Sequence, residues 1–178
     1  ARTLGMENKL VEKYMLLGRP PDTDPIRMLH MKQIAAVAVP FGFFIASEVP
    51  YTLLLFPLGF VMPDVFYYSR KISARQTDIL RSFPTFVDLA ALMIESGLDY
   101  MNAFDRIVKI APVKTNLELE VESTINEVQL GYSRRNALRR LSVRTGLQEV
   151  RSFAGLIIQS DELGTSLVDL LRNYSADM

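Results

Sequence analysis

Apolar residues in the second half of the chain follow a helical period. From residue 83 onward they recur at the i, i+3 and i+4 spacing of helices that bury one face against a core. Phe153, Ala154 and Ile157 form one such stripe, and five further stretches show the same spacing. The pattern predicts six helices packed as a bundle, which is an all-α fold.

A short motif divides these helices into hairpins. A glycine, which can take the left-handed conformation after a last helical turn, is followed two residues later by Asp or Ser, which can cap the next helix. The motif occurs at intervals of 34 and 33 residues, as Gly97 with Asp99, Gly131 with Ser133, and Gly164 with Ser166. Its three occurrences predict three helical hairpins.

Other residues predict further helix ends. Pro84 suits the first turn of a helix, where a missing N–H is tolerated. Thr115, followed three residues later by Glu118, matches a capping box, in which each side chain bonds the backbone N–H of the other residue. Gly146 predicts the end of a helix. We therefore expect helices to begin at Pro84 and near Thr115.

Residues 33–69 form an apolar block in which only Glu48 and Asp64 carry charge. A membrane-spanning helix needs about 20 apolar residues, and Glu48 divides the block into two shorter pieces. Basic residues flank it on both sides, at Lys32 and from Arg70 onward. This flanking charge favours a transmembrane helical hairpin with both ends in the cytoplasm and Glu48 in the outer turn. The alternatives are a single kinked span and a buried hairpin of a soluble protein.

These patterns predict four parts along the chain. Residues 1–32 form a juxtamembrane helical segment on the cytoplasmic side, and residues 33–69 form the transmembrane hairpin. Residues 70–82 form a linker helix without Gly or Pro, and residues 83–178 form a cytoplasmic six-helix domain. We expect the linker helix to connect the membrane hairpin mechanically to the bundle.

Composition excludes several functional classes. The chain has 20 acidic and 20 basic residues, so it lacks the basic excess that nucleic-acid binding calls for. It contains no cysteine and a single histidine, His30, and it has no P-loop, dinucleotide fingerprint or HExxH motif. We therefore expect no enzymatic activity, no cofactor and no metal site.

Charge is segregated between two of the predicted helices. Several glutamates lie between residues 118 and 127, and five arginines lie between residues 134 and 144. One interpretation is a pair of solvated faces that bond to each other across the hairpin. The other is a docking surface for an acidic partner, because clustered arginines favour electrostatic steering and bidentate contacts. The candidate docking residues are Arg134, Arg135, Arg139, Arg140 and Arg144.

The chain resembles the cytoplasmic domain of the type II secretion system F family of platform proteins. Two stretches carry the resemblance, FPTFVDLAALMIESGLDYMNAF and GYSRRNALRRLSVRTGLQEVRSFAGLIIQSDELGTSLVDLL. A single copy of the domain after a transmembrane pair is similar to the tight adherence protein C branch, which assembles Flp-type pili. Relatives normally continue into another transmembrane helix, so we expect this sequence, which stops at Met178, to be part of a longer protein.

The resemblance implies a platform protein in the bacterial inner membrane, without enzymatic activity of its own. Such proteins couple a cytoplasmic hexameric ATPase to the extraction of pilin from the membrane and its assembly into a filament. The implied partners are that ATPase, a paralogous platform protein of the tight adherence type, pilin and membrane lipid, in a homo- or hetero-oligomer.

Three alternatives to this assignment differ in function. A platform protein of another type II secretion or type IV pilus system has the same fold. A soluble tetratricopeptide-like adaptor is suggested by the 34-residue interval, although the chain has no Trp for that repeat's signature. A membrane enzyme or transporter would require polar residues inside the spans, and Ser47 and Thr52 are weak evidence for it.

Overall fold

The computed structural model describes residues 11–18, 30, 33–34, 37–38, 41–42, 68–163 and 167–176. The chain divides into two compact units, residues 1–74 and residues 75–178.

In the first unit, residues 11–16 form a short helix, which is followed by a turn at Gly18 with a φ of 83°. Residues 30, 33–34, 37–38 and 41–42 are also helical, and the large apolar side chains among them, Ile34, Val37 and Phe41, are each more than 60% exposed. Most of the predicted transmembrane hairpin, residues 33–69, lies outside the described residues. Within the described ranges, no helix combines the length and apolarity needed to cross a bilayer.

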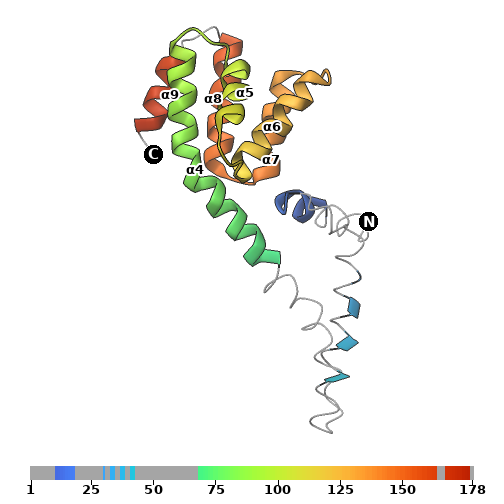
Figure 1. The fold of residues 1–178 in the computed structure, drawn as a ribbon. Helices are drawn as coiled ribbons and strands as arrows, with labels where there is room; N and C mark the ends of the chain where they lie inside the picture. The colour runs from blue at the N-terminus through green and yellow to red at the C-terminus, as the bar shows by residue number, and fades with distance from the viewer. Residues whose placement is uncertain are drawn as a thin grey trace. The chain divides into compact units, whose positions relative to one another are not determined.

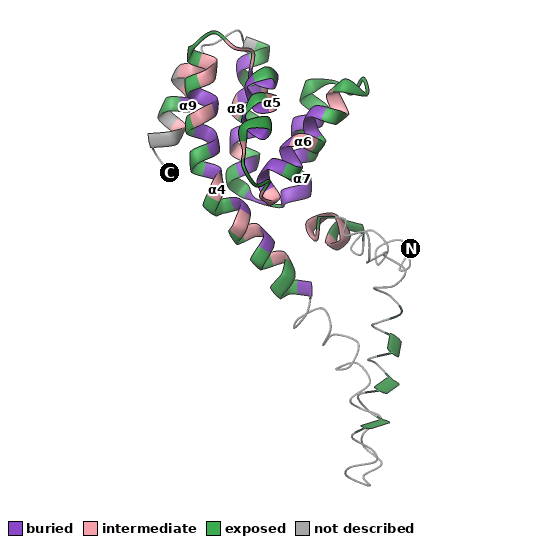
Figure 2. Ribbon diagram, viewed as in Figure 1, coloured by how far each residue is buried: buried purple, intermediate pink, exposed green. Residues whose placement is uncertain are grey.

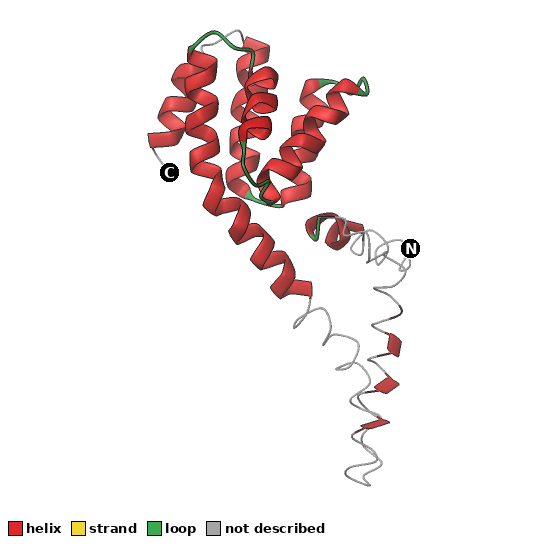
Figure 3. Ribbon diagram, in the orientation of Figure 1, coloured by secondary structure: helices red, strands yellow, loops and turns green. Residues whose placement is uncertain are grey.

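The second unit is a bundle of helices in antiparallel succession (Figures 1 and 3). Every regular element among the described residues is helical, as the sequence pattern predicts. The six labelled helices are α4 (Ser69–Glu95), of which residues 69–74 belong to the first unit, α5 (Tyr100–Ile110), α6 (Asn116–Gln129), α7 (Arg134–Thr145), α8 (Gln148–Leu163) and α9 (Leu167–Ala176).

The predicted helix caps are confirmed at the described positions. Asp99 and Ser133 are the N-caps of α5 and α7, and each accepts a hydrogen bond from a backbone N–H in the first turn. Thr115 and Glu118 form the capping box of α6.

The predicted turn glycines are confirmed in the same way. Gly97 and Gly131 both have a φ of +96°, and Gly146 caps α7 in the left-handed conformation. The third predicted turn, at Gly164 and Ser166, lies outside the described residues.

Helix α4 corrects the prediction for Pro84. Pro84 does not begin a helix but lies in the interior of the 27-residue helix α4. An interior proline removes one backbone hydrogen bond, and this loss is tolerated here because the neighbouring turns pack firmly. Phe83 and Phe86 are at most 3% exposed, and the Ser82 hydroxyl donates to the carbonyl oxygens of Asp78 and Ile79.

The core is centred on four phenylalanines from three helices. Phe153 of α8 contacts Phe83, Phe86 and Phe104, with ring centroids 5.5, 6.2 and 5.9 Å away. Phe86 and Phe104 contact each other at 5.2 Å. Figure 2 shows the buried residues along the inward faces of the helices. Since aromatic side chains bury large apolar areas, this cluster holds α4, α5 and α8 together.

Candidate functional site

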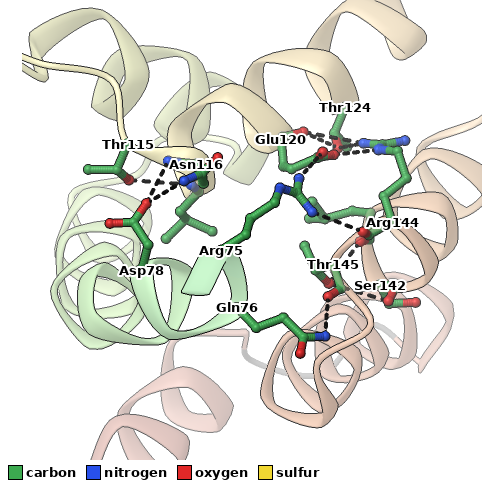
Figure 4. A network of polar contacts seen from close by, with 12 residues as sticks. Arg75, Gln76, Asp78, Thr115, Asn116, Glu120, Thr124, Ser142, Arg144 and Thr145 are labelled. Carbon is green, nitrogen blue, oxygen red and sulfur yellow. Dashed lines mark hydrogen bonds and ion pairs between the residues drawn. The ribbon is translucent and has the colours of Figure 1, made fainter. Parts of the chain in front are cut away.

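A buried ion-pair network joins three helices near the start of the second unit (Figure 4). Arg75 of α4, Glu120 of α6 and Arg144 of α7 are 9%, 8% and 3% exposed. Arg75 precedes Ile79 by one helical turn, so it lies on the face of α4 that packs on the bundle. Charged side chains are buried at this level only when they are paired.

Glu120 lies between the two arginines. Its Oε1 atom is 2.5 Å from Nη2 of Arg75, and its Oε2 atom is 2.5 Å from Nε of Arg144. Thr124, one turn further along α6, accepts a hydrogen bond from Nη2 of Arg144 at 2.8 Å and donates one to the Glu120 carbonyl at 2.9 Å. One carboxylate therefore ties α4 and α7 to α6.

Glu127 extends the network towards the surface. Its Oε1 atom accepts a hydrogen bond from Nη1 of Arg144 at 2.7 Å. Its Oε2 atom is 3.4 Å from Nε of Arg140, whose side chain is 44% exposed. This oxygen is buried and has no hydrogen-bond partner, so the ion pair with Arg140 is its principal stabilising contact.

Helix α4 also caps the ends of two other helices. Arg75 and Gln76 donate hydrogen bonds to the carbonyl oxygens of Arg144 and Thr145, at the C-terminus of α7. Asp78 accepts hydrogen bonds from the backbone N–H and the side-chain amide of Asn116, at the N-terminus of α6. A cation at a helix C-terminus and an anion at an N-terminus both interact favourably with the helix dipoles.

The predicted arginine surface on α7 is only partly exposed. Arg144 is buried, so it belongs to the interior network and does not contribute to a surface. Arg134 pairs with Asp99 at 2.8 Å, and Arg135 pairs with Glu162. Arg139 is exposed. Intramolecular pairs therefore use several of the arginines, and docking of a partner through the exposed ones stays a prediction.

Two tyrosines lie against these arginines. The Arg140 guanidinium is 5.0 Å from the ring centroid of Tyr132, and that of Arg134 is 5.4 Å from the Tyr100 ring, within the range of cation–π contacts. Burial raises the pKa of Tyr100, and the hydrogen bond from its hydroxyl to Asp161 raises it further. Tyr100 therefore remains protonated and keeps donating to Asp161 well into the alkaline range.

The polar groups of the network bond to one another. Each of its carboxylates faces at least one guanidinium, and the Thr124 hydroxyl bonds to Arg144 and to the Glu120 carbonyl. Within the described part of the chain, no group of three His, Asp, Glu or Cys residues is placed to hold a metal ion. The arrangement is suited to fixing α4, α6 and α7 relative to one another.

Sequence reasoning identified Arg144 and the cap residues but not the α4 side of the network. Arg75, Gln76 and Asp78 are polar residues in a stretch predicted to be a linker, and their partners are far away along the chain. A usable signal was present, since Arg75 continues the buried stripe of Ile79 and Phe83 by one turn.

Residues 86–178 match the family model described as type II secretion system (T2SS), protein F. The matched segment comprises 93 of the 178 residues, more than half of the chain. It begins inside α4 and includes α5 to α9. We found no significant match among curated proteins or among solved structures.

Proposed function

Because the chain belongs to the type II secretion system protein F family, we propose that it serves as the inner-membrane platform of a Flp-type, tight adherence pilus machine. Proteins of this family are platform proteins of type II secretion and type IV pilus-related machines and not enzymes. In the proposed role, the bundle receives motion from a cytoplasmic hexameric ATPase. Its membrane part uses that motion in pilin extraction and filament assembly, together with a paralogous platform protein.

The family match over residues 86–178 is the observation that carries the platform role, and the Flp-type assignment is supported by the sequence resemblance to the tight adherence branch. Helix α4 supports it further, because it extends without interruption from Ser69, next to the apolar block, to Glu95 in the bundle. A continuous helix transmits rotation and displacement better than a flexible linker does.

The proposed contact with the ATPase is the outer surface of α7. Arg134, Arg135, Arg139 and Arg140 are exposed there, and Arg134 and Arg135 already bond acidic groups of the bundle. Arg140 also pairs with Glu127, at 3.4 Å. Arg139 is therefore the arginine best placed to bind a carboxylate of a partner, a role in which arginine's bidentate geometry is favoured.

Charge reversal tests this docking proposal. Arg135→Glu with Arg139→Glu should abolish pilus assembly and co-purification with the ATPase, because a docking surface of like charge repels its partner. The matched control is Arg106→Glu with Arg151→Glu, which reverses two exposed arginines on α5 and α8. Normal assembly by a folded Arg135→Glu, Arg139→Glu variant would exclude docking of the ATPase through these two arginines.

We further propose that residues 33–69 form a transmembrane hairpin that places the bundle in the cytoplasm. Its support is the charge-poor sequence and its basic flanks. Since the chain has no cysteine, Glu48→Cys gives a unique label site at the proposed outer turn. A membrane-impermeant maleimide should label Glu48→Cys in intact cells and should leave an Asn126→Cys control in α6 unlabelled. Labelling of both positions, or release of the protein by alkaline carbonate, would contradict the hairpin and favour a soluble adaptor.

A further inference from the structure

Five charged side chains of alternating sign form a continuous series from the surface of α7 to α4. In order they are Arg140, Glu127, Arg144, Glu120 and Arg75. The four successive N···O distances are 3.4, 2.7, 2.5 and 2.5 Å. The first member lies on the proposed docking surface, and the last belongs to the helix that leads towards the apolar block.

The series has one accessible end. The Arg140 side chain is 44% exposed, whereas the other four are between 4% and 13% exposed. Charges at this depth are weakly screened by solvent, so a change at one member alters the interactions of the next.

The link at the accessible end is the weakest of the four. The Oε2 atom of Glu127 is held by Arg140 at 3.4 Å and accepts no hydrogen bond. A carboxylate of a partner can therefore compete with Glu127 for the Arg140 guanidinium, while the Oε1 atom of Glu127 stays bonded to Arg144. Docking of that carboxylate would neutralise the positive charge of Arg140 without unfolding the bundle.

A count of charges shows whether docking of a partner tightens or loosens the attachment of α4. In the free protein, the other four members of the series, Glu120, Arg144, Glu127 and Arg140, have charges that sum to zero. When a partner neutralises Arg140, the remaining three sum to minus one. Arg75, which is positive, is then attracted more strongly, so α4 is held more tightly on α6 and α7.

We propose that Arg140 senses an acidic partner and that its engagement tightens the attachment of α4 through Glu127, Arg144 and Glu120. The identity of the partner rests on the proposed function, but the coupling is a property of this chain alone. Arg140 is in this sense a positioning residue for α4. Docking on α7 would thereby stiffen the helix that transmits motion.

Hydrogen exchange of the full chain in detergent, without any partner, tests the coupling. Amides of residues 75–82 report the local opening of α4, and amides of α8 report the stability of the core. Arg140→Gln should slow exchange of residues 75–82 about three- to tenfold relative to α8. Arg139→Gln, which removes the neighbouring exposed arginine, is the matched control and should leave that exchange unchanged.

Replacement of the next member, Glu127, by the isosteric glutamine should change the exchange rate in the opposite direction. Glu127→Gln leaves Arg75 facing a net charge of plus one, so exchange of residues 75–82 should accelerate by a similar factor. The Arg140→Gln, Glu127→Gln double variant restores a sum of zero and should return close to the wild-type rate. Faster exchange in Arg140→Gln, or equal effects of Arg139→Gln and Arg140→Gln, would overturn the coupling.

A soluble polyanion tests the engagement of Arg140 directly. At low ionic strength, poly-L-glutamate should slow exchange of residues 75–82 in the wild type and leave it unchanged in Arg140→Gln. Equal slowing in both proteins would show that Arg140 is not the sensor. If the exchange results hold while the Arg135→Glu, Arg139→Glu variant assembles pili normally, the coupling stands and the assignment of the ATPase to this surface fails.

Discussion

Replacement of Arg144 by methionine should be the most destabilising single change in the bundle that leaves the phenylalanine core intact. Arg144 donates to Glu120 at 2.5 Å, to Glu127 at 2.7 Å and to the Thr124 hydroxyl at 2.8 Å. Methionine fills much of the same space but leaves both carboxylates short of a cation. Breaking a buried ion pair by removing one partner costs about 3–5 kcal/mol.

That loss is large relative to the stability available. A unit of 104 residues, 75–178, is expected to unfold with about 5–15 kcal/mol. With a urea dependence of about 1–3 kcal/mol per M, the unfolding midpoint of Arg144→Met should fall by roughly 2 M. Pulse proteolysis of the full chain in urea, with the surviving bundle quantified by mass spectrometry, measures this midpoint.

The matched control is Lys109→Met. Lys109 pairs with Asp105 at 2.6 Å, but its side chain is 72% exposed, so its loss should cost only about 0.3–0.5 kcal/mol. Adding Arg75→Met and Glu120→Leu to Arg144→Met should recover part of the stability, because the Arg75–Glu120–Arg144 part of the network is then apolar and only Glu127 remains short of a cation. A midpoint shift for Arg144→Met no larger than that for Lys109→Met would refute the reasoning.

Three further predictions concern local features of the bundle. Gly131→Ala should lower the free energy of unfolding by about 1–2 kcal/mol, because φ at Gly131 is +96°. Gly155→Ala in α8, where an added Cβ meets open space, should raise it by up to about 1 kcal/mol. The urea midpoints of the two variants should therefore shift in opposite directions. Burial and the bond to Asp161 raise the pKa of Tyr100 above its unfolded value of about 10, so its contribution is complete below that pH and is lost as pH rises towards the folded pKa. Unfolding midpoints measured over the alkaline range should accordingly fall less steeply in Tyr100→Phe than in the wild type. Thr115→Ala, which removes the hydroxyl of the α6 capping box, should lower the unfolding free energy by about 1 kcal/mol, and an unchanged midpoint would contradict that role.

Helix boundaries in the bundle were predictable because their causes are local. The caps at Asp99, Thr115 and Ser133 depend on a side chain and an N–H two or three residues away. The turns at Gly97 and Gly131 depend on one backbone angle each. Such features are present in the sequence whatever the helix later packs against.

The network on α4 could not be predicted in the same way. The bond from Arg75 to Glu120 joins residues 45 positions apart, and it exists only because α4 packs beside α6. Pro84 shows the same limitation, since packing of the flanking aromatic residues outweighs the local preference of proline for a helix start.

Arg144 was predicted to lie on a surface because the prediction used the number of arginines in α7 and not their positions relative to its apolar stripe. It follows Leu141 by three residues and Ala137 by seven, and both are buried. Those spacings place Arg144 on the inward stripe of α7, whereas Arg139 and Arg140 lie on the outward side. The position of each arginine relative to the apolar stripe was thus a better guide than the number of arginines.

The continuity of α4 has a practical consequence for work with the isolated domain. The family match starts at residue 86, but Ile79 and Phe83 of the core and Arg75 of the network precede it. A recombinant fragment cut at residue 86 would lack two of α4's deepest apolar side chains and would leave Glu120 with one arginine instead of two. A fragment that starts at Ser69 retains all of these contacts and is the better choice for crystallisation or NMR of the bundle.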